Sequence, residues 1–240
     1  MRRRSLLAAA GAAALLPASA RADEPVDVAL VLAIDVSRSV DEDEARLQRE
    51  GYRAAVTDPR VVEAIRGGML GSIAIAYVEW AGSEYQRLVL PWVRIDSQAA
   101  ADSWAEALAQ APRASLSWTS ISGAIDFSRS VLAECPHEAT RRVIDVSGDG
   151  VNNSGVPAEQ ARDRAVAEGI TINGLPILND RPTFGRPPPL PLDAYYRESV
   201  IGGQGAFLIP AEDFEAFGNA VRRKLIREVA GLGGPVTDWG

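Results

Sequence analysis

The sequence of 240 residues is poor in the residues that cross-linking and metal clusters use, because it has one cysteine and one histidine. A lone cysteine excludes an intrachain disulfide, and we expect Cys135 to be a buried or half-buried thiol, with a disulfide to another chain as the alternative. Aromatic residues make up 6%, and 25 basic against 32 acidic residues give a net charge of −7. Because phosphates are bound by clustered lysine and arginine, we expect no nucleic-acid partner.

No apolar run after the N-terminal region approaches the ~20 residues that a membrane span requires. Residues 1–5 are basic, residues 6–16 are apolar, and small residues follow up to Ala22. This order is typical of a secretory signal peptide. Arg3 and Arg4, followed by Ser-Leu-Leu, also resemble a twin-arginine export signal. We expect residues 1–22 to be removed on export to the periplasm or the exterior, leaving a chain without an integral membrane span.

Strand and helix patterns alternate through the rest of the chain. Residues 26–34 are almost continuously apolar, which indicates a central strand buried on both faces. Further strands are expected at 73–80, 87–95, 142–147, 170–177 and 206–209. Helices are expected from about 40 to 57 and at 97–110, 121–134, 157–168, 193–199 and 212–229, with a turn at Asp58-Pro59.

This alternation predicts one α/β domain over residues 25–230, a doubly wound and mostly parallel sheet with helices on both faces. A short polar connection before residues 87–95 predicts one antiparallel edge strand. The proline-rich segment 181–192 is expected to be either a stiff loop that covers part of the domain or a segment that a partner protein binds. Residues 231–240 are expected to form a flexible tail. Arg222, Arg223 and Lys224 are expected to form an exposed helix face.

Five oxygen-bearing side chains follow or precede elements that meet at one edge of such a sheet. Asp35, Ser37 and Ser39 directly follow the first strand, Thr119 lies in the loop that opens a helix, and Asp149 follows the strand at 142–147. Ligands of doubly wound sheets bind beyond the carboxyl ends of the strands. Two carboxylates and three hydroxyls are hard donors that favour Mg²⁺, Mn²⁺ or Ca²⁺ over zinc or copper.

Simpler interpretations exist for parts of this pattern. An aspartate with serines after a strand is often a helix N-cap, and the acidic residues 41–44 are more typical of a helix start than of a second cation site. Asn152 and Asn153 fit a turn or flank the metal. Trp118 is either a packed loop anchor or an aromatic residue on the rim that a partner contacts.

The motif Asp35-x-Ser37-x-Ser39, followed by Thr119 and by Asp149-Gly150, resembles the metal-ion-dependent adhesion site of von Willebrand factor type A domains. The resemblance covers residues 25 to 230. Within this superfamily, the sequence most resembles exported bacterial proteins of unknown function. It implies a divalent ion, Mg²⁺ above others, held by Asp35, Ser37, Ser39, Thr119 and Asp149. The ending Ser-Gly-Asp-Gly departs from the commoner Thr-Asp-Gly ending of the family.

The resemblance implies an exported protein-interaction module, not an enzyme, in which an Asp or Glu carboxylate of a protein partner completes the metal shell. Trp118 and Asn152 would lie on the partner-binding rim. A metal-assisted hydrolase is an alternative, although the only nearby bases would be Glu79 or Glu84 and there is no nucleophile-elbow motif. A periplasmic solute- or polysaccharide-binding protein with a structural metal is a third hypothesis.

Overall fold

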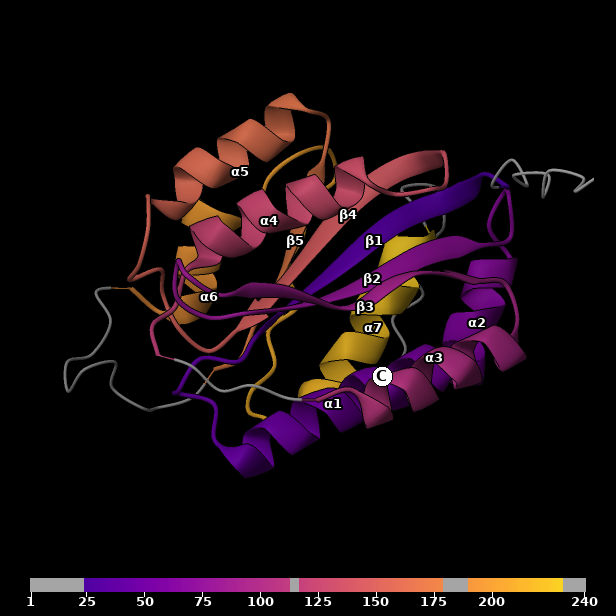
Figure 1. The fold of residues 1–240 in the computed structure, drawn as a ribbon, viewed down its shortest axis with the longest axis horizontal. Coiled ribbons are helices and arrows are strands. Elements are labelled where there is room, and N and C mark those ends of the chain that lie inside the picture. Colours follow the sequence, from indigo (N-terminus) through magenta and orange to yellow (C-terminus); the bar gives the residue numbers. More distant parts are fainter. Residues whose placement is uncertain (1–23, 113–116, 179–189, 231–240) are drawn as a thin grey trace, which may run out of the picture.

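The computed structural model describes residues 24–112, 117–178 and 190–230, which form one central sheet between two layers of helices (Figure 1). The predicted signal peptide, the tail at 231–240 and most of the proline-rich loop lie outside the described residues. Along the chain the elements are β1 (Val26–Asp35), α1 (Glu42–Thr57), α2 (Pro59–Arg66), β2 (Ile73–Trp80), β3 (Gln86–Ile95), α3 (Gln98–Gln110), α4 (Ile121–Ala133), β4 (Ala139–Gly148), α5 (Ala158–Ala167), β5 (Thr171–Pro176), α6 (Leu192–Tyr195), the π-helix η1 (Tyr196–Val200) and α7 (Phe217–Ala230).

The sheet has the strand order β3-β2-β1-β4-β5. β1 pairs in parallel with both β2 and β4, β5 is parallel to β4, and β3 is the antiparallel edge strand. β1 lies at the centre, and its residues from Val28 to Asp35 are all buried, which explains the continuous apolar run. The predicted doubly wound α/β fold is therefore confirmed.

Two apolar cores lie on opposite faces of the sheet. Alternate residues of β1 point to opposite faces, so Leu30 and Leu32 pack against α1, α2, α3 and α7, while Val31 and Ala33 pack against α4 and α5. Figure 1 shows the same division, with α1, α2, α3 and α7 on one side of the sheet and α4 and α5 on the other. None of the helices in the described ranges is long and apolar enough to cross a membrane.

The acidic residues at 41–44 form a helix start. Asp41 is the N-cap of α1 and accepts a hydrogen bond from the Glu44 backbone N–H, while the Glu44 side chain accepts one from the Asp41 N–H. This reciprocal capping box satisfies two backbone donors, and the acids face the positive end of the helix dipole. The geometry favours the helix start over a second cation site.

Three local expectations were wrong. The turn expected at Asp58-Pro59 is instead the start of a second helix, α2. Asp58 caps this helix, and Pro59 is its first residue. Residues 206–209 do not form a strand, because within them only Leu208 bridges to β5, at Gly174. The helix expected at 193–199 is split into α6 and the π-turn η1. Cys135 is half-buried, as expected.

Lys224 is a fourth correction, because it is completely buried instead of lying on an exposed face. α7 places Lys224 on the same side as Val221, Leu225 and Glu228, all of which face the sheet. Its Nζ lies 2.7 Å from Asp145 Oδ1 of β4 and 2.5 Å from Glu228 Oε1. Buried charges persist when they are paired, and this contact joins α7 to the centre of the sheet.

The buried cluster holds one cation and two carboxylates, so one negative charge is left without a counter-charge. Burial is the main cause that raises the pKa of Asp145 to about 7, and the carboxylate of Glu228 raises it further, against the lowering effect of Lys224. Asn173 Nδ2 donates a hydrogen bond of 3.0 Å to Glu228. The raised pKa means that Asp145 takes up a proton at a higher pH in the folded chain than in the unfolded chain.

We predict that Asp145 makes folding stability fall as pH rises from about 4 to about 7. Its pKa is raised from 3.8 to about 7 on folding, so the folded chain binds more protons than the unfolded chain across this interval. The free energy of unfolding should fall by up to about 1.4 kcal/mol per pH unit from this group. Asp145→Asn should remove that slope in urea titrations at several pH values.

Asp163→Asn is the matched control, since Asp163 is exposed on α5 and pairs with Arg162. This variant should keep the pH slope of the unaltered chain. An Asp145→Asn chain with the same slope as the unaltered chain would show that Asp145 is ionised throughout.

Candidate metal centre

The carboxyl ends of β1 and β4 lie side by side at the centre of the sheet. Ile34 of β1 pairs with Ser147 of β4, so that Asp35 is the last residue of β1 and Asp149 follows the end of β4. In the strand order β3-β2-β1-β4-β5 the chain winds in opposite directions on the two sides of this pair. Such a switch point leaves a crevice above the strand ends, where doubly wound sheets bind ligands.

The loop after β1 folds back on its own aspartate. The Ser37 N–H donates to Asp35 Oδ1 at 2.7 Å, and the Val40 N–H donates to the Ser37 carbonyl at 3.0 Å. This turn gathers the hydroxyls, so that Ser37 Oγ and Ser39 Oγ are 3.0 Å apart. Ser39 Oγ in turn donates to Asp149 Oδ1 at 2.6 Å, which joins the two loops. Four of the five predicted ligands therefore form one connected cluster.

Thr119 reaches the same cluster through the loop that follows β4. Its N–H donates to the Asn153 side-chain carbonyl at 2.8 Å, and the Asn153 N–H donates to the Thr119 carbonyl at 2.9 Å. Its hydroxyl lies beside Gly150, where an added Cβ would be 3.7 Å from Thr119 Oγ1. Ser120, the next residue, caps α4. The structure thus brings all five predicted residues to one place.

The electrostatics of this cluster favour a cation. Burial raises the pKa of the Asp35 carboxyl well above its usual range, and the nearby charge of Asp149 raises it further. Asp35 Oδ2 is buried and accepts no hydrogen bond within the described residues. Ser39 is exposed, so the cluster opens to solvent on one side. A divalent ion would relieve the repulsion between the two carboxylates and give Asp35 Oδ2 a partner, so these residues fit such an ion.

The donor set also limits which ion the cluster suits. Within the described ranges, no three His, Cys, Asp or Glu side chains lie close enough to hold a metal. The candidate centre therefore depends on two carboxylates supplemented by hydroxyls. This is the chemistry of a hard cation, and it lacks the nitrogen and sulfur donors of typical structural zinc sites.

Gly148 explains the departure of this chain from the commoner sequence ending. A Cβ at this position would lie 3.0 Å from Asp35 Oδ2 and 3.0 Å from the Tyr196 hydroxyl, both side-chain atoms that are buried. A larger residue would displace Asp35. Sequence reasoning missed Tyr196, because nothing in the pattern at 193–199 shows that a π-turn directs this tyrosine toward Asp35.

The two residues predicted for the rim differ in how they are held. Trp118 is 57% exposed and has a φ of 73°, a left-handed conformation that costs a bulky residue free energy. Asn152 uses its side chain within the protein, because Oδ1 accepts from the Ser122 N–H at 3.0 Å and Nδ2 donates to the Val156 carbonyl at 3.0 Å. Asn152 therefore joins the loops of the site, and its rim role stays a prediction.

A second polar contact, which sequence reasoning did not anticipate, holds the chain just before the Thr119 loop. Arg49 of α1 pairs with the buried Glu79 of β2 at 2.7 Å and also donates to the carbonyls of Ala111 and Pro112. Glu79 is thus committed to a structural ion pair, and Glu84 is exposed in the connection between β2 and β3. These positions give no specific support to the hydrolase hypothesis.

The family model for "Protein of unknown function (DUF1194)" matches residues 25–233. No curated protein matches the sequence. Among solved structures, proximal thread matrix protein 1 from the mussel byssus has a TM-score of 0.62 and 12% identity, covering 87% of this chain and 48% of that one. Another structure of that mussel protein, with a TM-score of 0.56 and 15% identity, covers 85% of this chain and 47% of that one and has a zinc-occupied metal-ion-dependent adhesion site.

Two bacterial structures share the fold. The von Willebrand factor type A protein of Catenulispora acidiphila has a TM-score of 0.57 and 18% identity, covering 86% of this chain and 43% of that one. The pilus adhesin SpaC of Lactobacillus rhamnosus GG has a TM-score of 0.59 and 13% identity, with coverages of 88% and 31%. This chain spans about half the length of these structures or less. The chain belongs to the DUF1194 family, and its fold is that of the von Willebrand factor type A domains.

Proposed function

We propose that this protein is an exported interaction module that binds a protein partner through a divalent cation. Asp35, Ser37, Ser39, Thr119 and Asp149 would hold the ion. The observation that carries the proposal is the hydrogen bond from Ser39 Oγ to Asp149 Oδ1 at 2.6 Å, which joins the loops after β1 and β4 around a buried aspartate.

The composition of the site favours a carboxylate as the missing ligand. Mg²⁺ takes six oxygen ligands, and the hydroxyls of Ser37, Ser39 and Thr119 add no negative charge of their own. Five side chains leave at least one position to water or to an outside oxygen. An Asp or Glu carboxylate from a partner would supply both the oxygen and additional negative charge. Mg²⁺ is our first choice of ion, with Mn²⁺ and Ca²⁺ as alternatives.

The fold and its neighbours support an interaction role. The similar structures include an adhesin of bacterial pili and a matrix protein of mussel threads. Trp118 stands beside Thr119 with more than half of its surface exposed, so it offers a partner a large apolar contact next to the ion. We include Asn152 in the same rim as the residue that keeps the two loops together.

We predict that Asp35→Asn and Asp149→Asn each weaken Mn²⁺ binding by at least about tenfold, since each removes a charged ligand without changing side-chain volume. Isothermal titration of the metal-stripped protein with Mn²⁺, and then with Mg²⁺, measures this. Asp163→Asn, an exposed aspartate of α5, is the matched control and should bind one equivalent like the unaltered chain. Unchanged binding in both site variants would remove the proposed centre.

Partner capture is the second arm of the same test. Immobilised protein should retain a partner from a periplasmic or extracellular extract in Mg²⁺ and release it when the ion is chelated. Asp149→Asn should retain none, while Asp163→Asn should behave like the unaltered chain. Equal retention by Asp149→Asn would contradict the interaction role even if the ion is bound.

We predict that Trp118→Gly weakens partner capture but does not lower the melting temperature. Glycine adopts a φ of 73° without strain, so the loss of the side chain is offset by the relief of an unfavourable backbone conformation. Met69→Ala is a suitable control, because Met69 is 91% exposed in the connection that leads into β2, remote from the strand ends that carry the site. A marked fall in melting temperature for Trp118→Gly would show that Trp118 is a packed anchor instead.

Export provides a separate prediction. The protein expressed in a bacterial host with its whole sequence should be recovered outside the cytoplasm with Asp23 as its first residue, because cleavage after Ala22 follows the small-residue pattern. Mass spectrometry of the N-terminal peptide measures this. Replacement of Arg3 and Arg4 by lysine distinguishes the routes, since only twin-arginine export depends on the arginine pair. A full-length chain that stays in the cytoplasm contradicts the proposal of export.

A further inference from the structure

A hollow of about 550 Å³ lies at the end of β4 remote from Asp149. It is bounded by the first residues of β4, the start of β5, the glycine-rich turn at 203–205, and Phe207. Arg142, which lines it, is separated from Asp149 by about 20 Å of extended strand. The hollow is therefore independent of the candidate metal centre.

The hollow exists because β5 begins later than β4. Pairing between the two strands starts only at Val143 and Thr171, so residues 139–142 of β4 have no partner strand on this side. The turn at 203–205 closes the opening, and Gln204 supplies its only side chain. Gly203 has a φ of 93°, and a Cβ there would lie 2.8 Å from the Ile170 carbonyl, so only glycine fits.

Three arginines line this hollow, which we call the arginine hollow. Arg141 and Arg142 are neighbours on β4 and so project from opposite faces of the strand, while Arg227 comes from the last turn of α7. Arg141 donates to the Glu228 backbone carbonyl, and Arg142 donates to the Glu168 backbone carbonyl. Arg227 lies over the Phe207 ring, with its guanidinium carbon 4.1 Å from the ring centre.

In the described part of the chain, none of these three arginines forms an ion pair with a carboxylate, although most other arginines there do. The two acids whose backbone carbonyls they contact have their side chains paired elsewhere. Glu168 pairs with Arg129, and Glu228 pairs with Lys224. Three arginines thus line one opening in a chain whose net charge is −7.

We propose that the arginine hollow binds a small organic molecule with two or more phosphate or carboxylate groups. Guanidinium groups match the geometry of both anions, and each of the three keeps donors beyond those used for backbone carbonyls. The volume is that of a small-molecule site, and Val143, Val166 and Phe207 supply apolar walls for the body of such a ligand.

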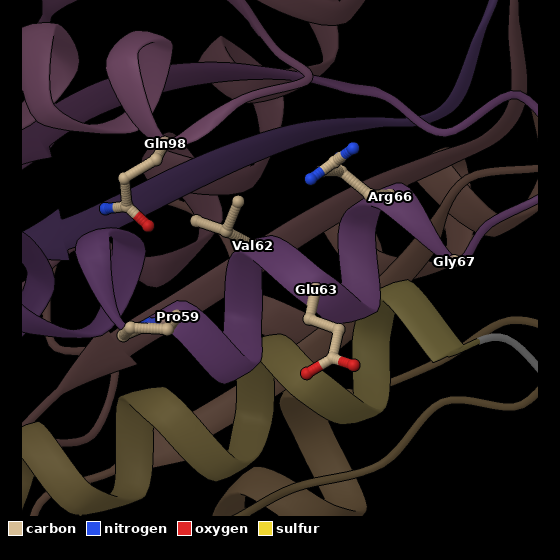
Figure 2. Close-up of a pocket in the computed structure, with 6 residues that line it drawn as sticks. All are labelled: Pro59, Val62, Glu63, Arg66, Gly67 and Gln98. Atoms are coloured by element: carbon tan, nitrogen blue, oxygen red, sulfur yellow. The ribbon is translucent and has the colours of Figure 1, made fainter.

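A second hollow has a similar volume of about 540 Å³, but its charged residues do not favour one class of ligand. It lies along α2 and the start of α3, and Figure 2 shows the side chains that line it. Its charged residues are Glu63 and Arg66, one of each sign, so no class of ligand is favoured by charge.

The test uses the folded protein after metal is stripped with a chelating resin, because polyanions would otherwise bind through a divalent ion. Pyrophosphate and citrate are titrated separately at constant ionic strength, and binding is followed by calorimetry. We expect saturable binding of one equivalent of at least one probe, which identifies the phosphate or the carboxylate source. Arg142→Gln and Arg227→Gln together should weaken it by at least about tenfold.

Arg46→Gln is the matched control, because Arg46 is exposed on α1 and pairs with Asp43 outside the hollow. It should bind the probe like the unaltered chain. If the double variant does not fold, Arg142→Gln alone replaces it in the test, because Arg142 is exposed. This single variant should also weaken binding of the probe. Absence of saturable binding of both probes, or equal binding by the Arg142→Gln and Arg46→Gln chains, would overturn the proposal.

Discussion

The parallel pairing of β1 with β4 at the centre of the sheet is the constraint on which the rest of the structure depends. It sets Ile34 beside Ser147 and so brings Asp35 and Asp149, which are far apart in the sequence, to the same edge. β1 from Val28 onward and β4 from Val143 onward are buried on both faces, so this part of the pairing is protected from water by helices on each side. The loops that follow then need only short turns to place their hydroxyls, as the hydrogen bonds of Ser37 and Ser39 show.

Most of the sheet could be predicted from the sequence, because its strands are long apolar runs separated by helical patterns. The bounds at Ile73–Trp80 were predicted as the structure has them, and the hairpin to β3 followed from a short polar connection. The five residues of the candidate centre could be predicted to meet, since each lies at a strand or helix end on the same edge. Their spacing alone could not show that Asn153 holds Thr119, because that bond depends on the path of two loops.

The errors share a physical cause, which is that tertiary contacts decide where a polar residue belongs. The run Arg222-Arg223-Lys224 has the composition of a solvated helix face. Lys224 nevertheless occupies a core position, because it pairs there with the buried carboxylates of Asp145 and Glu228. Asp58-Pro59 has the composition of a turn, but the aspartate side chain can cap a helix that proline begins. Local sequence patterns predicted most helices and strands. The places of Lys224 and Asp58 depend on side-chain contacts that these patterns do not contain.

The buried contact between Lys224 of α7 and Asp145 of β4 also ties the last helix to the centre of the sheet. A carboxylate at the centre of a sheet is costly to bury alone, by several kcal/mol, until its counter-charge arrives. Lys224 belongs to the last helix of the described chain, so the middle of the sheet is completed only when that helix packs. The last helix of the described chain therefore does more than cover one face of the sheet, because it brings the cationic group that the middle of β4 contacts.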